Sequence, residues 1–451
     1  MVLEKYIKTV EKTDPVKYIG TVKRVQGILV ESTGPRAAVG ELCHILRSDG
    51  TSLLAEVVAV NQEIVQLMGY ETLEGLETGD PVVASGNLLS VGVGEEMLGR
   101  VLDALGRPID GKGPYKTSDQ YAIFNNPPPP LERKPIYKKI ITGIRAIDAL
   151  TPVGQGQRMG IFAGSGVGKS TLLGMIARNT SADVNVIALI GERGREVREF
   201  IENELGEEGL KRSVLIVSTS DTPALARVRG AFTATAVAEY FRDQGNNVML
   251  LFDSVTRFAM SQREIGLAIG EPPTTRSYTP SVFAVLPKLL ERPGVSAKGT
   301  ITGFYSVLVE GDDMDEPVAD AVRGYLDGHI VLDRKLAEKN HYPAIDVLAS
   351  ISRVAPRLMN KTAAASSGKL RNLLASYREK EDLIDVGAYV KGSDPVVDEA
   401  IEKKNGIDSF LKQAIDEYEE PSSVYKRAAE LAGVDTDENK DSEDETVSVF
   451  A

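Results

Sequence analysis

The chain has 451 residues, of which 42% are hydrophobic and 26% charged, and its formal net charge is −13. As a prior, this length allows about three domains, each with a core of its own. The negative charge repels phosphate backbones and anionic lipid surfaces, so it argues against a nucleic-acid motor and against a lipid-surface protein.

The first predicted element is a short helix at the N-terminus. Apolar residues recur at helical spacing over residues 1–12, and Pro15 stops the pattern. Residues 1–16 are assigned to this segment. It is either a terminus that packs on its own domain or a helix that docks on a partner, and the pattern leaves both open.

Residues 17–92 are predicted to form a small antiparallel β-barrel. Their short strand-like runs are rich in Val and Ile and are separated by Gly and Asp. Only two Phe, Trp or Tyr residues occur here, so stacking on a single-stranded nucleic acid is not indicated. The runs are Tyr18–Val30, Val39–Leu46, Leu53–Val60 and Pro81–Ala84.

Residues 93–360 are predicted to form an α/β domain. Pro127–Pro130 is a stiff extended connector within it. From Arg158 onward, apolar runs alternate with helical stretches such as Pro223–Gln244 and Val255–Ala268, which indicates a parallel sheet covered on both faces. The apolar runs are Met159–Ala163, Val186–Ile190, Val214–Val217, Val248–Phe252 and Tyr305–Val309.

The last part of the chain is predicted to be helical and then disordered. Residues 361–430 form a helical domain, with helices expected over Leu370–Tyr377 and Asp398–Tyr418. Residues 431–451 are assigned to an acidic tail, because seven acidic residues and one lysine lie between Asp435 and Glu445.

The strongest motif is a phosphate-binding loop between a predicted strand and a predicted helix. Its glycines let successive backbone N–H groups point at phosphate oxygens, and the helix adds the positive end of its dipole. Lys169 would reach the β- and γ-phosphates, and the Ser170 hydroxyl would bind Mg²⁺. Ala163 stands where the strict motif has Gly, which a negative φ would tolerate. The predicted nucleotide-binding residues are Gly164, Ser165, Gly166, Val167, Gly168, Lys169, Ser170 and Thr171.

Two carboxylates follow other predicted strands of the same sheet. Asp253 ends an apolar run and would hold the shell of the Mg²⁺ ion. Glu192 follows Val186–Ile190 and could orient the attacking water, because ligands of such sheets lie at the carboxyl ends of the strands. From position alone, Glu192 could also be an ordinary loop carboxylate.

Longer motifs resemble the hexameric rotary-type ATPases, the relatives of the catalytic subunit of ATP synthase. Within that family they are most similar to the flagellum-specific type III export ATPases. The resemblance covers nearly the whole chain and implies a RecA-like domain between a barrel and a helical domain. Ser277 departs from the family pattern, which usually has Gly at the position before Tyr278. The stretches that carry the resemblance are Ile190–Phe200, Asp253–Ala259, Gln262–Gly266, Gly270–Pro273, Thr279–Phe283 and Gly387–Ser393.

The resemblance also implies roles for single residues. Glu192 matches the catalytic carboxylate, and Arg193 and Arg257 match arginines around the phosphates. Tyr342 matches the aromatic residue that stacks on adenine. Arg353 matches the arginine finger that a neighbouring subunit inserts, although without the resemblance it would be taken for a surface arginine.

The implied function is the ATPase of flagellar protein export, a cytoplasmic homohexamer that uses ATP and Mg²⁺ at the inner-membrane export apparatus. Its implied partners are an export regulator bound through residues 1–16, a central coiled-coil stalk, the export gate complex in the membrane, and flagellar substrate–chaperone complexes. No nucleic acid is expected. Cys43 is the only cysteine and no apolar run approaches the ~18 residues of a membrane span, so a cytosolic protein with no span of its own is expected.

Four alternatives remain. They are a virulence injectisome ATPase, the catalytic subunit of another rotary ATPase, a non-catalytic nucleotide-binding subunit, and an RNA-translocating hexamer. The presence of both Glu192 and Arg353 argues against the non-catalytic subunit, and the acidic, aromatic-poor barrel argues against the RNA motor.

Overall fold

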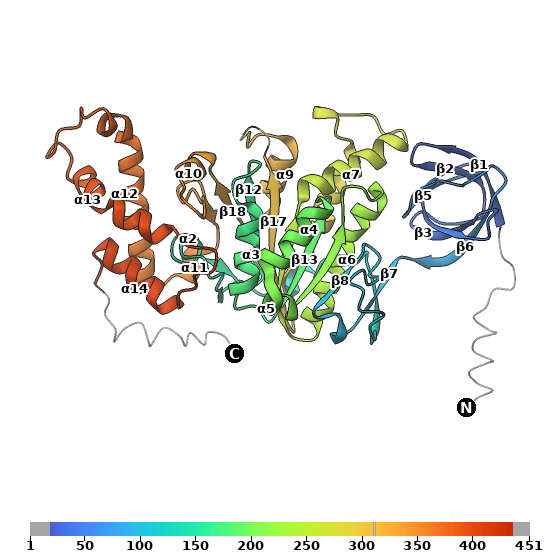
Figure 1. Ribbon diagram of the computed structural model, residues 1–451, viewed down its shortest axis with the longest axis horizontal. Helices are drawn as coiled ribbons and strands as arrows, with labels where there is room; N and C mark the ends of the chain where they lie inside the picture. Colours follow the sequence, from blue (N-terminus) through green and yellow to red (C-terminus); the bar gives the residue numbers. More distant parts are fainter. Residues whose placement is uncertain (1–18, 310, 312, 436–451) are drawn as a thin grey trace.

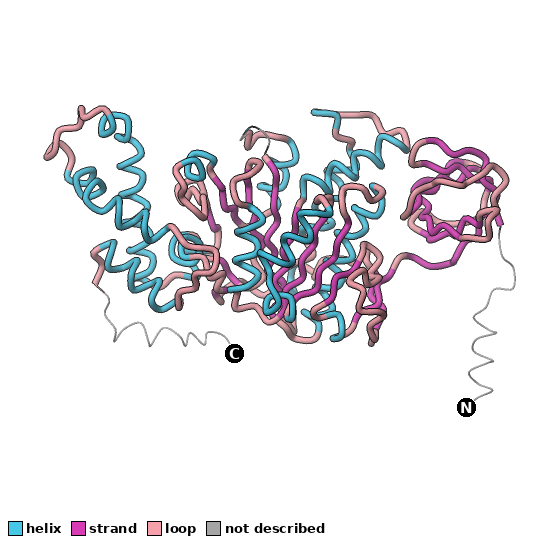
Figure 2. Tube along the Cα trace, viewed as in Figure 1, coloured by secondary structure: helices cyan, strands magenta, loops and turns pink. Residues whose placement is uncertain are grey.

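The computed structural model describes residues 19–309, 311 and 313–435, which form three bodies in a row (Figure 1). A β-barrel lies at one end, an α/β domain in the middle and a group of helices at the other end, as the colouring by secondary structure makes plain (Figure 2). This is the predicted fold class. The helix expected over residues 1–12 and most of the acidic tail lie outside the described residues.

The barrel is closed by six antiparallel strands in the order β1-β2-β5-β4-β3-β6. Its interior is filled by aliphatic side chains such as Val30, Ile45 and Leu53, each with no exposed surface. From Ile19 onward, the predicted run Tyr18–Val30 forms β1 and the start of β2, which are joined by a turn that contains Gly27 at φ 59°. Strand β5 was not predicted from the sequence. The strands are β1 (Ile19–Gln26), β2 (Leu29–Thr33), β3 (Glu41–Leu46), β4 (Ser52–Asn61), β5 (Ile64–Gly69) and β6 (Pro81–Leu88).

A buried ion pair joins the barrel to the central domain. Arg229, on helix α6 (Ala224–Asp243), donates from Nε and Nη2 to the two carboxylate oxygens of Glu56 at 2.9 and 2.5 Å. The Tyr70 hydroxyl donates to the same carboxylate at 2.5 Å. Because the Glu56 side chain is 1% exposed, this contact fixes where the barrel sits on α6.

The central sheet runs in the order β19-β18-β12-β17-β15-β13-β14-β8, with β16 paired to β17. All neighbouring pairs along this path are parallel except β18 with β19. The short strand β8, which the sequence did not reveal, extends the sheet beyond β14. The strands are β8 (Arg100–Leu102), β12 (Arg158–Ala163), β13 (Val184–Ile190), β14 (Ser213–Ser218), β15 (Asn247–Asp253), β16 (Gly294–Val295), β17 (Thr300–Leu308), β18 (Gly328–Leu332) and β19 (Ile351–Ser352).

Successive residues of the central strands pack into two different cores. Val186 and Ala188 of β13 belong to the core that includes helices α6–α9, whereas Ile187 and Leu189 belong to the core that includes α3. A strand buried on both faces reads as a continuous apolar run, which is why these strands were predictable. The helices are α3 (Lys169–Asn179), α4 (Gly194–Glu199), α5 (Gly206–Lys211), α7 (Val255–Ala268), α8 (Pro280–Leu290) and α9 (Pro317–Tyr325), and a π-helical stretch (Phe200–Leu205) joins α4 to α5.

Shorter elements complete the domain at its margins. Two small antiparallel pairs, β7 with β9 and β10 with β11, lie outside the main sheet. The connector around Pro127–Pro130 ends in a single 3₁₀ turn. These elements are β7 (Ser90–Val93), β9 (Asp119–Ala122), β10 (Lys139–Ile140), β11 (Val153–Gly154) and the 3₁₀ turns Glu95–Met97, Pro130–Glu132 and Thr275–Ser277, with short helices α2 (Arg145–Leu150), α10 (Arg334–Glu338) and α11 (Ala355–Leu358).

Three helices form the C-terminal domain: α12 (Lys361–Asp385), α13 (Pro395–Leu411) and α14 (Pro421–Ala432). The helix expected over Asp398–Tyr418 ends at Leu411 instead. Arg145 of α2 explains the stop, because it donates to the carbonyls of Phe410 and Lys412 and pairs with Glu417. Within the described residues, no helix is both long and apolar enough to cross a bilayer.

Candidate active site

The phosphate-binding loop connects β12 to α3, as predicted. Ala163 is the last residue of β12, so its backbone is extended and the departure from Gly costs nothing there. Gly166 and Gly168 have φ values of 78° and 92°, a region that side-chain-bearing residues avoid. Helix α3 begins at Lys169 directly after Gly168, and its first backbone N–H groups therefore face the loop.

Three charged residues meet beside this loop. The Lys169 ammonium donates to Asp253 Oδ1 at 2.5 Å and lies 3.8 Å from Glu192 Oε1. Asp253 ends β15 and Glu192 follows β13, and these strands are neighbours in the sheet, so their carboxyl ends bring the two acids together. Ser306 of β17 donates its hydroxyl to the same oxygen of Asp253 at 2.7 Å, which orients the carboxylate.

Burial and neighbouring charges shift the pKa values of Glu192 and Lys169. Desolvation, followed by repulsion from Asp253, raises the pKa of Glu192 to about 7 although Lys169 and Arg257 oppose the shift. A carboxylate with a pKa near neutrality is suited to accept a proton during catalysis. Burial alone would lower the pKa of Lys169, but attraction by Asp253 and Glu192 raises it, so the ammonium stays charged.

Arg257 reaches the site because residue 191 has no side chain. Gly191 has φ 78°, and a Cβ placed on it would lie 2.7 Å from Arg257 Cβ and 3.1 Å from Arg257 Cγ. The backbone before Glu192 therefore approaches α7 more closely than any other residue type allows. The motif contains this glycine, but its contact with Arg257 could not be read from the sequence.

Three predicted residues lie apart from these contacts. The Arg193 side chain is 75% exposed and pairs with Glu196 at 3.3 Å, so the structure does not bring it to Lys169. Ser170 is exposed in the first turn of α3. Thr171 donates its hydroxyl to Glu204 Oε1 at 3.0 Å.

Tyr342 lies against the phosphate-binding loop although 173 positions separate it from Lys169 in the chain. Two of its ring carbons are 3.7 Å from the position that a Cβ on Gly168 would occupy. Its backbone carbonyl accepts from the N–H of Gln413 at 2.9 Å, and the Gln413 side chain accepts from the N–H of Arg145 at 3.0 Å. Gln413 and Arg145 thus support the tyrosine, and no sequence motif pointed to either.

Arg353 lies at the other edge of the sheet. Leu332, the last residue of β18, is opposite Ala163 at the phosphate-binding loop, whereas Gly328, the first, is opposite Ser352. At roughly 3.3 Å per residue, β18 separates these two ends by about 13 Å. Arg353 is exposed, and its N–H donates to Asp327 O at 2.9 Å. The structure therefore does not place Arg353 in the site of its own chain.

The donors beside the loop fit a magnesium ion. Mg²⁺ prefers oxygen ligands and usually takes one or two protein ligands together with substrate phosphates. The Asp253 carboxylate and the Ser170 hydroxyl provide such oxygens, and Asp253 is already held by Ser306. A phosphate-binding loop, a lysine and these oxygen ligands are the groups that a magnesium nucleotide requires.

Comparison with known proteins identifies each of the three bodies. The nucleotide-binding domain of the ATP synthase alpha/beta family matches residues 143–352, and the beta-barrel domain of that family matches residues 22–86. The C-terminal domain of the type III secretion ATPase EscN matches residues 359–427.

Individual relatives match almost the full length of the chain. The flagellum-specific ATP synthase of Treponema pallidum is 57% identical over 92% of this chain and 93% of its own. The assembled ATPase EscN of enteropathogenic Escherichia coli is 44% identical, with a TM-score of 0.87, over 92% of this chain and all of EscN. EscN in complex with its central stalk EscO gives 43% and a TM-score of 0.85 over the same shares.

Proposed function

Because the chain belongs to the ATP synthase alpha/beta family and its relatives include ATPases of flagellar and type III secretion systems, we propose that it hydrolyses ATP to drive flagellar protein export. Its identity to the flagellar relative of Treponema pallidum, 57%, exceeds its 50% identity to the type 3 secretion system ATPase of Xanthomonas euvesicatoria, which favours the flagellum over an injectisome. The observation that carries the catalytic proposal is the meeting of Lys169, Asp253 and Glu192 beside the phosphate-binding loop.

Each of these residues has a distinct role in the proposed reaction. The loop N–H groups and Lys169 hold the phosphates, and Tyr342 stacks on the adenine. Glu192 orients the attacking water and accepts its proton. Asp253 and Ser170 hold Mg²⁺, which neutralises charge on the phosphate oxygens. Arg257 adds positive charge to the same side of the site.

Arg353 completes the site of a neighbouring copy. It lies at the edge of the sheet opposite the loop and is exposed, which suits a side chain that reaches another subunit. A guanidinium spreads positive charge over several oxygens, and such fingers accelerate hydrolysis by on the order of 10³–10⁵. The assembly proposed is a homohexamer, supported by the likeness to EscN, which was solved in its assembled form.

Complementation between two inactive variants tests this proposal. Lys169→Ala keeps the finger but loses the phosphate site, and Arg353→Ala keeps the phosphate site but loses the finger. Each alone is expected to be nearly inactive, and mixing exchangeable subunits should restore part of the hydrolysis. If subunits demonstrably exchange and a linked tandem of fixed order also stays inactive, Arg353 does not act in trans.

The proposed partners follow from the same family. The EscN complex with EscO supports a central stalk protein in the pore of the ring. Residues 1–16 would bind an export regulator, and the assembled ring would act in the cytoplasm at the membrane export gate on substrate–chaperone complexes. A motility and filament-export assay in a strain lacking this gene separates flagellar export from injectisome secretion.

A further inference from the structure

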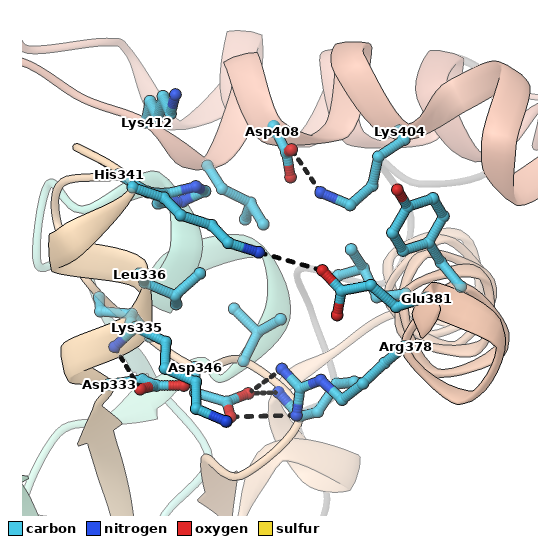
Figure 3. Close-up of a pocket in the computed structure, with 17 residues that line it drawn as sticks. Asp333, Lys335, Leu336, His341, Asp346, Arg378, Glu381, Lys404, Asp408 and Lys412 are labelled. Carbon is cyan, nitrogen blue, oxygen red and sulfur yellow. Dashed lines mark hydrogen bonds and ion pairs between the residues drawn. The ribbon is translucent and has the colours of Figure 1, made fainter. Parts of the chain in front are cut away.

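A cavity of about 510 Å³ lies between the nucleotide-binding domain and the helical domain (Figure 3). Ion pairs bridge it. Lys339, just after α10, donates to Glu381 of α12 at 3.0 Å, and Asp346 faces Arg378 of the same helix. These ion pairs supplement an apolar core that contains Ile345 and Val347 together with Leu370 and Leu373 of α12.

The Asp346–Arg378 pair makes two hydrogen bonds, whereas the Lys339–Glu381 pair makes one. Arg378 donates from Nη2 to Asp346 Oδ1 at 2.9 Å and from Nη1 to Oδ2 at 3.1 Å. Such two-point pairing fixes orientation as well as distance. The Asp346 side chain is 10% exposed and that of Arg378 50%, so the pair lies at the cavity wall, partly screened by solvent.

Asp346 also organises the turn that follows it. Its Oδ1 accepts from the N–H groups of Leu348 and Ala349 at 2.9 and 3.2 Å. Its backbone carbonyl accepts from both the N–H and the hydroxyl of Ser350, at 3.0 and 2.7 Å. Arg371, seven residues before Arg378 on α12, donates to the Ser350 carbonyl at 2.9 Å. Helix α12 therefore holds this turn at both ends.

The turn leads directly to Arg353. After Ser350 come the two residues of β19, which pair with the start of β18, and then the proposed finger. We call residues 341–353 the finger segment. Its first part carries Tyr342, beside the phosphate-binding loop of its own chain, and its last residue is Arg353.

We propose that Arg378 is a positioning residue for hydrolysis, which sets Arg353 for the neighbouring site by holding the finger segment through Asp346. The proposal rests on the proposed role of Arg353 in trans. It makes α12 of the helical domain the element that determines whether the finger is in place. A displacement of about 1 Å at a catalytic group can cost on the order of 10²-fold in rate.

Substitution of Arg378 and mixing of subunits test the proposal. Arg378→Gln should lower kcat at least about tenfold with unchanged affinity for a fluorescent ADP analogue, since the chain's own phosphate site is intact. Arg378→Lys should lie between Arg378→Gln and the wild type, because an ammonium keeps the charge but not the two-point geometry. The control is Lys380→Gln on the same helix, whose ammonium pairs with its sequence neighbour Glu379 at 3.3 Å and with no other carboxylate among the described residues.

The decisive measurement adds an inactive chain. Lys169→Ala subunits carry an intact Arg378 and finger, so adding them to Arg378→Gln should raise hydrolysis per intact phosphate site. The same addition to the wild-type protein should not raise its hydrolysis per intact phosphate site. A merely destabilised Arg378→Gln would gain nothing, and that result overturns the proposal, as would a wild-type kcat. If Lys169→Ala and Arg353→Ala fail to complement each other in a parallel experiment, Arg353 does not act in trans. The proposed role of Arg378 then fails as well.

Discussion

Gly191→Ala adds one methyl group at the closest backbone approach in the site. Residue 191 has φ 78°, and holding a residue with a side chain there costs about 1–2 kcal/mol. The new Cβ would lie 2.7 Å from Arg257 Cβ, well inside the ordinary carbon–carbon separation of about 3.5–4.0 Å. Overpacking of this kind adds about 1–3 kcal/mol. We therefore expect a loss of stability of about 2–5 kcal/mol.

The same methyl group should impair hydrolysis. Arg257 must move by about 1 Å, and Glu192 next to residue 191 moves with the backbone, so kcat should fall on the order of 10²-fold. Urea denaturation measures the first effect, and phosphate release at saturating ATP measures the second. Gly194→Ala is the matched control, since no atom lies within 4 Å of its added Cβ. Wild-type stability and rate for Gly191→Ala would refute the reasoning.

Three further predictions test other parts of the structure. Lys169→Ala should abolish binding of a fluorescent ATP analogue, and retained affinity would contradict the phosphate role of Lys169. Arg229→Met should lower stability by about 3 kcal/mol because it leaves the buried Glu56 unpaired, and adding Glu56→Met should recover most of the loss in the urea midpoint. Deleting residues 1–12 should leave hydrolysis unchanged and abolish co-purification with the export regulator; an unchanged pull-down would argue against a docking helix.

The long central strands of the sheet and the helices between them were predictable from the sequence alone. Helix α7 has the predicted bounds, Val255–Ala268, because it follows a strand directly and its Ser254 cap accepts from the Arg257 N–H. The end of α13 was not predictable. Apolar residues at helical spacing continue to Ile415 and Tyr418, but both are about half exposed, and the chain leaves the helix because Arg145 binds its carbonyls. A contact between residues so distant in sequence leaves no local signal.

The residues of the site also differ in whether local sequence patterns predict them. Lys169, Glu192 and Asp253 each follow an apolar run that forms a strand of the same parallel sheet, so the carboxyl ends of these strands predict that the three residues meet. Tyr342 and Arg353 belong to a segment with little regular structure, and only the family resemblance pointed to them. Their supports, Gln413 and Arg378, come from the helical domain and act through hydrogen bonds to residues distant in the sequence, which leave no periodic pattern.

The distance between the loop and Arg353 has a consequence for assembly. In the proposed assembly, each chain contributes its phosphate site to one interface and its finger to another, so the contact between copies is head-to-tail. Such contacts generate either a closed ring or an open filament. In an open oligomer, one terminal phosphate site always lacks a finger, whereas in a closed ring every site is complete. Specific activity should therefore rise with the first interface and reach its full value only on closure, so the smallest oligomers hydrolyse ATP at a lower rate per chain than the ring.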